Sequence, residues 1–143
     1  RQGAIPVDNI SENLQKMDAV TLHCPKNDET TNLFTKKEFN LMKKSSFIIN
    51  CARGGILNEE DLYEALKNEN ISGAGLDVFD VEPTPSSNPL FKLNNVILSP
   101  HIAGVTVEST VRMATETVQN VLDVLDDKVN QSVVINNKEI GMK

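Results

Sequence analysis

Short apolar runs alternate with amphipathic segments along the first hundred residues of the chain. Four of these runs are typical of buried strands: residues 19–23, 47–50, 73–79 and 96–98. The segments between them carry helix signals, so strands and helices are expected to alternate. That order favours an α/β fold with a parallel sheet and right-handed crossovers.

Capping residues mark where two of the helices begin. Thr35 is followed three residues later by a glutamate, a capping-box spacing that predicts a helix over about residues 36–43. Asn58 predicts the start of a second helix over about residues 59–68, with three acids in its first turn.

The two ends of the chain complete the pattern. Ser11 is expected to cap a short helix that reaches about residue 16. Apolar residues recur at spacings of three and four over residues 107–126, which predicts a long amphipathic helix packed on a neighbouring surface. The run VVIN at 133–136 is expected to form one more strand.

Composition narrows the class of protein. A hydrophobic content of 39% and a charged content of 24% in 143 residues are typical of a folded domain. The net charge of −6 argues against nucleic acids and acidic membranes as partners. Cys24 and Cys51 form no CxxC pair and no metal-ligand cluster, so we expect free thiols, a cytoplasmic location and no metal site.

Ionisable residues follow the carboxyl ends of the four predicted strands. In strand order they are His23, Arg53, Asp80 with Glu82, and His101. In open parallel sheets, ligands bind outside the carboxyl ends of the strands. We therefore expect these side chains to share one edge of the sheet.

An arginine, an acid and a histidine at one edge suit a particular kind of substrate. The Arg53 guanidinium can bind a carboxylate through two parallel hydrogen bonds. His101 can give or take a proton near neutral pH, and a carboxylate such as Glu82 can fix its tautomer. These groups fit a 2-hydroxy acid or a 2-oxo acid, and hydride transfer between the two requires a cofactor.

Each of these residues also has a purely structural alternative. Arg53 can be a surface residue in a Gly-Gly turn, and Glu82 a solvated loop acid. His23 can cap the end of its strand by hydrogen bonding, and His101 can be a loop histidine with its hydrogen bonds satisfied. Asp77 is harder to explain in this way, because an acid within an apolar strand costs free energy unless it is paired.

Four motifs, in order and in register, resemble the nucleotide-binding domain of the D-isomer-specific 2-hydroxyacid dehydrogenases: DAVTLHCP, INCARGGILNEEDLYEAL, ISGAGLDVFDVEP and NVILSPHIAG. This family includes D-3-phosphoglycerate dehydrogenase and the hydroxypyruvate and glyoxylate reductases. The resemblance implies a partial Rossmann-type, doubly wound parallel sheet that lacks its first strands and ends in the long helix. It also implies hydride transfer with NAD, or with NADP, as cofactor.

The resemblance carries roles to matched positions. Arg53 matches the residue that binds the substrate's carboxylate and carbonyl, His101 the acid/base, and Glu82 the partner of that histidine. Asp77 matches the acid that meets the nicotinamide carboxamide. The full set of implied cofactor-binding residues is His23, Pro25, Thr30, Cys51, Ala52, Arg53, Asp77, His101 and Gly104.

Several features depart from the family's pattern. The sequence contains no GxGxxG phosphate loop and no acid that would select NAD over NADP, and PKNDET at 25–30 is an unusual version of its loop. We expect a fragment, with residues 1–128 a partial dinucleotide-binding domain and 129–143 a tail that returns to an absent substrate domain. The isolated fragment is expected to be inactive and the whole enzyme a homodimer. The alternatives are a dinucleotide-binding regulatory protein and an inactive truncated remnant.

Overall fold

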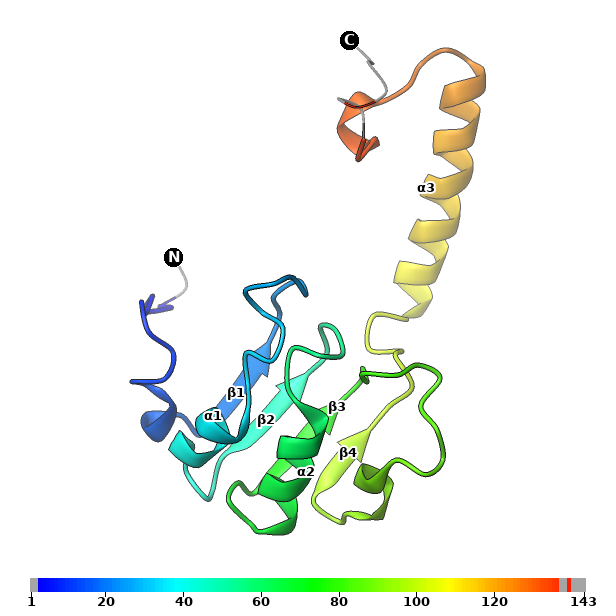
Figure 1. Cartoon of the computed structure of the whole chain (residues 1–143). Coiled ribbons are helices and arrows are strands. Elements are labelled where there is room, and N and C mark those ends of the chain that lie inside the picture. The colour runs from blue at the N-terminus through cyan, green and yellow to red at the C-terminus, as the bar shows by residue number, and fades with distance from the viewer. Residues whose placement is uncertain (1–2, 137–138, 140–143) are drawn as a thin grey trace. The chain divides into compact units, whose positions relative to one another are not determined.

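The computed structural model describes residues 3–136 and 139, which belong to two compact units (Figure 1). The first unit extends to Ala103 and the second begins at Gly104. The domain boundary expected at residue 128 concerns the parent protein and stays a prediction.

A parallel sheet of four strands forms the centre of the first unit. Its strands are β1 (Ala19–Leu22), β2 (Phe47–Asn50), β3 (Gly73–Leu76) and β4 (Val96–Leu98), in the order β1-β2-β3-β4. Leu22 pairs with Asn50, Asn50 with Leu76, and Leu76 with Leu98. All four strands therefore end at the same level, and the predicted α/β class is confirmed.

Two short helices connect the first three strands, and both begin where the capping residues predicted. In α1 (Lys36–Leu41) Thr35 and the glutamate three residues later form a complete capping box. In α2 (Glu59–Lys67) the Asn58 side chain accepts a hydrogen bond from the backbone of Asp61. Helix α1 ends earlier than predicted, because Met42 is already extended.

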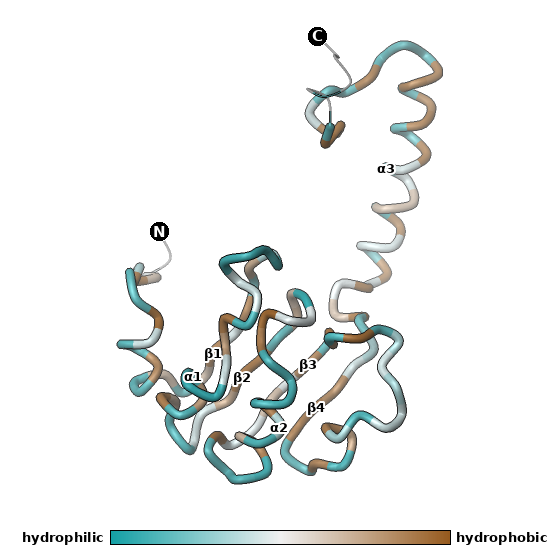
Figure 2. The backbone as a smooth tube through the Cα atoms, viewed as in Figure 1, coloured by the Kyte–Doolittle hydropathy of each residue, from teal (hydrophilic) through white to brown (hydrophobic). Residues whose placement is uncertain are grey.

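The core lies between the sheet and the two helices, which pack against each other. Strand residues such as Ile48 and Leu76 alternate toward it and are buried. The alternate strand positions face the other way, and there Phe47 is 48% and Ile97 80% exposed. Figure 2 shows hydrophobic residues along the strands and hydrophilic ones in the loop beyond β1. One face of the sheet is thus covered by helices of this unit.

Three sequence predictions for the first unit are corrected by the structure. Strand β3 ends at Leu76, so Asp77 follows the strand and does not lie within it. Strand β1 ends one residue before His23. Ser11 caps no helix: a single 3-10 turn, η1 (Leu14–Lys16), forms there and has no side-chain cap.

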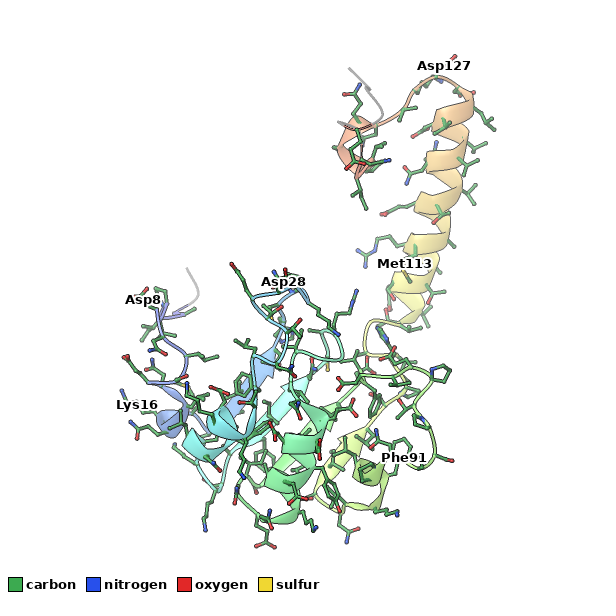
Figure 3. The ribbon with its side chains drawn as sticks, viewed as in Figure 1. Asp8, Lys16, Asp28, Phe91, Met113 and Asp127 are labelled. Atoms are coloured by element: carbon green, nitrogen blue, oxygen red, sulfur yellow. The ribbon has the colours of Figure 1, made fainter. Side chains whose placement is uncertain are left out.

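The second unit contains one long helix, α3 (Val107–Leu125), whose bounds match the prediction closely. Thr106 caps it through the backbone N–H of Ser109, and none of its residues is buried. Figure 3 shows its side chains, with Met113 labelled. The strand expected at 133–136 is wrong: a 3-10 turn, η3 (Gln131–Val133), stands at its start, and the described residues include no strand beside it. Among the helices that the structure describes, none is both long and apolar enough to span a membrane.

Candidate active site

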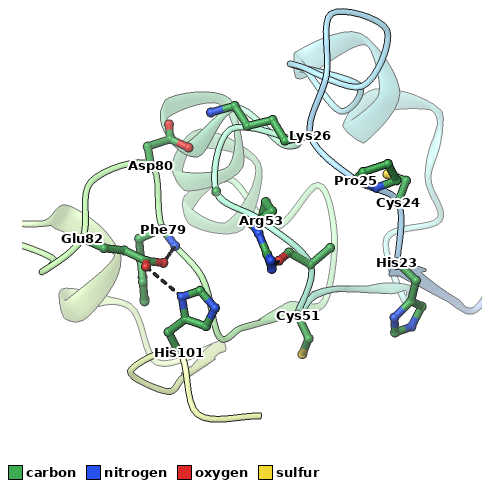
Figure 4. Close-up of a pocket in the computed structure, with 12 residues that line it drawn as sticks. His23, Cys24, Pro25, Lys26, Cys51, Arg53, Phe79, Asp80, Glu82 and His101 are labelled. Carbon is green, nitrogen blue, oxygen red and sulfur yellow. Dashed lines mark hydrogen bonds and ion pairs between the residues drawn. The ribbon is translucent and has the colours of Figure 1, made fainter. Parts of the chain in front are cut away.

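The carboxyl ends of the strands open onto a cavity of about 700 Å³ (Figure 4). The residues that directly follow β1 to β4 are His23, Cys51, Asp77 and Ser99. Predicted site residues that line the cavity are His23, Pro25, Cys51, Ala52, Arg53, Glu82 and His101. The expectation that the strand ends bring these side chains to one edge is therefore confirmed.

Glu82 and His101 form a hydrogen-bonded pair across two loops. Oε2 of Glu82 lies 2.8 Å from Nδ1 of His101, and Oε1 accepts the backbone N–H of Phe79 at 2.9 Å. These hydrogen bonds, the one with His101 first, lower the pKa of Glu82 below the ordinary glutamate value. Because Nδ1 faces the carboxylate, Nε2 is the ring nitrogen left for another partner. The pair is only partly shielded, with 48% of the histidine side chain exposed.

Arg53 stands in a tight turn directly after β2, and Figure 4 shows it between the Glu82–His101 pair and the segment from His23 to Pro25. Its Nη1 donates to the carbonyl oxygen of Ala52 at 2.6 Å, and its side chain is exposed. A Cβ on Gly54 would lie 1.9 Å from the carbonyl oxygen of Phe79. Only glycine lets the turn approach the loop that carries Glu82 so closely.

Asp77 is buried beneath the site, with 3% of its surface exposed. Its carboxylate accepts hydrogen bonds from Ser99 Oγ at 2.6 Å and from the backbone N–H groups of Ile102 and Ala103, each at 2.9 Å. Burial by itself raises the pKa of Asp77, but these three bonds outweigh it and the pKa is lowered. The acid is thus satisfied by the loop that carries His101, and it does not line the cavity.

Two further predicted residues are not brought to the cavity. Thr30 donates to the carbonyl oxygen of Pro25 at 2.6 Å, so it shapes the loop after β1. Gly104 belongs to the second unit. His23 lines the cavity and shares a 2.9 Å hydrogen bond with Thr21, the strand-end contact named as its structural alternative. The roles of these residues toward a cofactor stay predictions.

The structure also adds residues that sequence reasoning missed. Lys26 lines the cavity, and its ammonium group lies over Gly55. Gly55 has a φ of +78°, and a Cβ at this position would lie 2.4 Å from Nζ of Lys26. Phe79 lines the cavity and makes an edge-on contact with Phe91, at 6.2 Å between ring centres. The Asn50 side chain hydrogen-bonds to the backbone of the turn that carries Arg53. The sequence feature that could have indicated this role is an amide residue at the end of an apolar strand.

Comparison with known proteins identifies the class of protein that this fold and site define. The profile of the D-isomer specific 2-hydroxyacid dehydrogenase NAD binding domain matches residues 1–103. A glyoxylate reductase of Thermofilum pendens is 42% identical over 127 residues, 89% of this chain and 37% of that protein. A D-3-phosphoglycerate dehydrogenase of Methanocaldococcus jannaschii is 41% identical over 90% of this chain and 24% of its own length.

Solved structures agree with this family. The D-isomer specific 2-hydroxyacid dehydrogenase of Lactobacillus delbrueckii ssp. bulgaricus, in its NAD complexed form, superposes with a TM-score of 0.79 and 30% sequence identity. The match covers 85% of this chain and 41% of that one. The chain therefore belongs to the D-isomer specific 2-hydroxyacid dehydrogenase family, as part of its NAD-binding domain. It spans about a quarter to two fifths of the length of these relatives.

Proposed function

We propose that the protein that carries this chain is a nicotinamide-dependent oxidoreductase that interconverts D-2-hydroxy acids and 2-oxo acids. The observation that supports this most is that Arg53 and the Glu82–His101 pair line one cavity at the carboxyl edge of the sheet. A guanidinium, an acid/base and its carboxylate partner are the groups that this chemistry requires.

The lining of the cavity fits an NAD nicotinamide and its neighbouring phosphate. On the side of β1 and β2 the cavity is lined by His23, Pro25, Cys51 and Ala52, with Lys26 as a nearby cation. A flat nicotinamide ring and an anionic phosphate suit such surroundings, and this edge is where α/β sheets bind dinucleotides. We assign cofactor binding to these residues. The bound nicotinamide would supply or accept the hydride.

Substrate binding and proton transfer are assigned to three side chains: Arg53, His101 and Glu82. In reduction, Arg53 binds the carboxylate of the 2-oxo acid and turns its carbonyl toward the cofactor. As the carbonyl carbon gains the hydride, its oxygen takes a proton from Nε2 of His101, which yields the 2-hydroxy acid. Glu82 holds Nδ1 of the same ring, which fixes its orientation and leaves Nε2 for the substrate.

A rate assay on the protein in the length that its source produces tests this proposal. NADH oxidation is followed at increasing concentrations of glyoxylate, hydroxypyruvate and phosphohydroxypyruvate, with NADPH in parallel. We expect turnover with at least one of these acids. Tight NADH binding without turnover would favour the regulatory alternative, and neither binding nor turnover would favour the inactive remnant.

Three finer statements belong to the same proposal. Residues 1–143 alone are expected to be inactive, because the sequence contains no GxGxxG loop to hold the pyrophosphate. The native enzyme is expected to be a cytoplasmic homodimer, as the family resemblance implies. The mass of one denatured chain, measured by mass spectrometry, shows whether the native chain is heavier than 15.8 kDa, and comparison with the mass of the native protein from light scattering tests the homodimer.

A further inference from the structure

Asn50 is a buried polar residue to which the proposed reaction gives no role. It is the last residue of β2, and only 1% of its surface is exposed. Its Nδ2 donates to the carbonyl oxygen of Arg53 at 2.9 Å, and its Oδ1 accepts the backbone N–H of Ala52 at 3.0 Å. One side chain therefore bonds to the N–H of the residue before Arg53 and to the carbonyl oxygen of Arg53 itself.

The backbone of Asn50 also links this turn to the loop of His101. The N–H of Asp77 donates to the carbonyl oxygen of Asn50 at 3.0 Å, and the N–H of His101 donates to the carbonyl oxygen of Asp77 at 2.8 Å. The carboxylate of Asp77 holds the remainder of that loop through Ile102 and Ala103. A continuous series of hydrogen bonds thus connects the turn of Arg53 with the loop of His101.

We propose that Asn50 is a positioning residue that fixes Arg53 relative to His101; this inference rests on the proposed function of the site. Removal of the buried Asn50 amide would leave the N–H of Ala52 and the carbonyl of Arg53 without these hydrogen-bond partners. The turn would have to shift to satisfy them. A displacement of about 1 Å at a residue that orients substrate can cost a hundredfold in rate.

A double-mutant cycle tests whether Asn50 acts through Arg53. In the native-length enzyme, Asn50→Ala is expected to lower kcat/KM for the 2-oxo acid by about 10- to 100-fold. In the Arg53→Lys background the same change is expected to lower kcat/KM by less than about threefold, because the guanidinium that Asn50 positions is already absent. Equal losses in both backgrounds would overturn the proposal.

The variant Asn50→Asp gives an independent signature. The introduced carboxylate can still accept from Ala52, but its second oxygen faces the carbonyl oxygen of Arg53 and cannot donate. A protonated carboxyl can donate there. The activity of this variant relative to wild type is therefore expected to rise as the pH is lowered, and a ratio that stays constant or falls would contradict the proposal.

Asn95→Ala is the matched control, since the Asn95 amide also donates to a backbone carbonyl, that of Leu66 at 3.1 Å, before β4 begins. Its effect should be the same with or without Arg53→Lys.

If Asn50→Ala does not fold, the pH dependence of the activity of Asn50→Asp relative to wild type decides. If the wild-type enzyme shows no turnover, the proposed function fails. Amide exchange of Ala52 then tests the hydrogen bonds of Asn50 alone: because Asn50→Ala removes the acceptor of the Ala52 N–H, exchange at Ala52 should be faster in Asn50→Ala than in Asn95→Ala, and equal exchange would overturn the proposal.

Discussion

The substitution Asp77→Asn tests whether the charged Asp77 carboxylate, rather than the packing of its side chain, supports the loop that carries His101. An asparagine retains one oxygen, which can still accept from Ser99 and Ile102, but its amide N–H₂ then faces the N–H of Ala103. One hydrogen bond to a charged acceptor is lost, worth about 1.5–3 kcal/mol, and two donors oppose each other. We expect the free energy of unfolding to fall by about 2–3 kcal/mol, measured by urea denaturation at neutral pH.

The pH dependence adds a second test of the same substitution. The folded-state pKa of Asp77 is lowered, so its stabilising contribution is complete above the ordinary aspartate pKa and is lost as the pH falls through the folded-state value. The stability deficit of Asp77→Asn should therefore shrink below about pH 4. A deficit that is independent of pH, or smaller than about 0.5 kcal/mol at neutral pH, would refute this account of the loop.

Glu38→Gln provides the matched control for Asp77→Asn. Glu38 is also a buried carboxylate, 8% exposed, and it accepts hydrogen bonds from Thr35 away from the cavity. Burial raises its pKa, but the bonds from Thr35 outweigh that effect and the pKa is lowered. Both substitutions should destabilise the fold, whereas only Asp77→Asn should also lower turnover. Equal turnover in the two variants would mean that Asp77 has no influence on His101.

Further substitutions test the individual roles. His101→Ala should lower kcat by about 10²- to 10⁴-fold while the NADH dissociation constant, measured by fluorescence, stays nearly unchanged; unaltered kcat would remove His101 from the reaction. Arg53→Lys should raise KM for the 2-oxo acid about tenfold or more, because a point charge cannot replace the fork; an unaffected KM would make Arg53 a turn residue only. Gly54→Ala should destabilise the protein by about 3 kcal/mol through its clash with Phe79, whereas Gly75→Ala, where a Cβ makes only ordinary contacts, should be milder; equal unfolding midpoints would refute that clash.

Much of the fold follows from short-range patterns in the sequence. The capping box at Thr35 and the cap at Asn58 gave both helix starts, because these side chains satisfy backbone N–H groups that no other local group can reach. Strands β2 and β4 have the predicted bounds, since each is a short apolar run that the next residues interrupt. The shared edge then follows from parallel topology alone.

The failures arise where burial continues but hydrogen-bond pairing does not. Val78 and Phe79 are buried, so the apolar run extends past Leu76, yet the sheet partner of β3 ends at Leu98 and the strand ends with it. The run at 133–136 fails for a different reason: its β-branched residues have strand propensity, but they are largely exposed and no strand among the described residues pairs with them.

The two buried residues that hydrogen-bond to the loops of the site, Asp77 and Asn50, were the hardest part to predict. Asp77 was recognised as unusual, but its partners are in a loop 22 to 26 residues further along the chain. No local pattern in the sequence predicts contacts over such a separation. The role of Asn50 was hidden because its side chain bonds only to its own turn, and an asparagine at a strand end is also a common loop residue. Both residues are defined by three-dimensional hydrogen bonding rather than by spacing.

The most direct test of the central claim is the stereochemistry of the product formed by the native-length enzyme. Hydroxypyruvate is incubated with NADH, and the 2-hydroxy acid formed is resolved on a chiral column and compared with the NADH consumed. We expect one D-2-hydroxy acid per NADH, and a loss of this product in His101→Ala. Formation of the L-acid, or saturable NADH binding with no product from any 2-oxo acid, would contradict it.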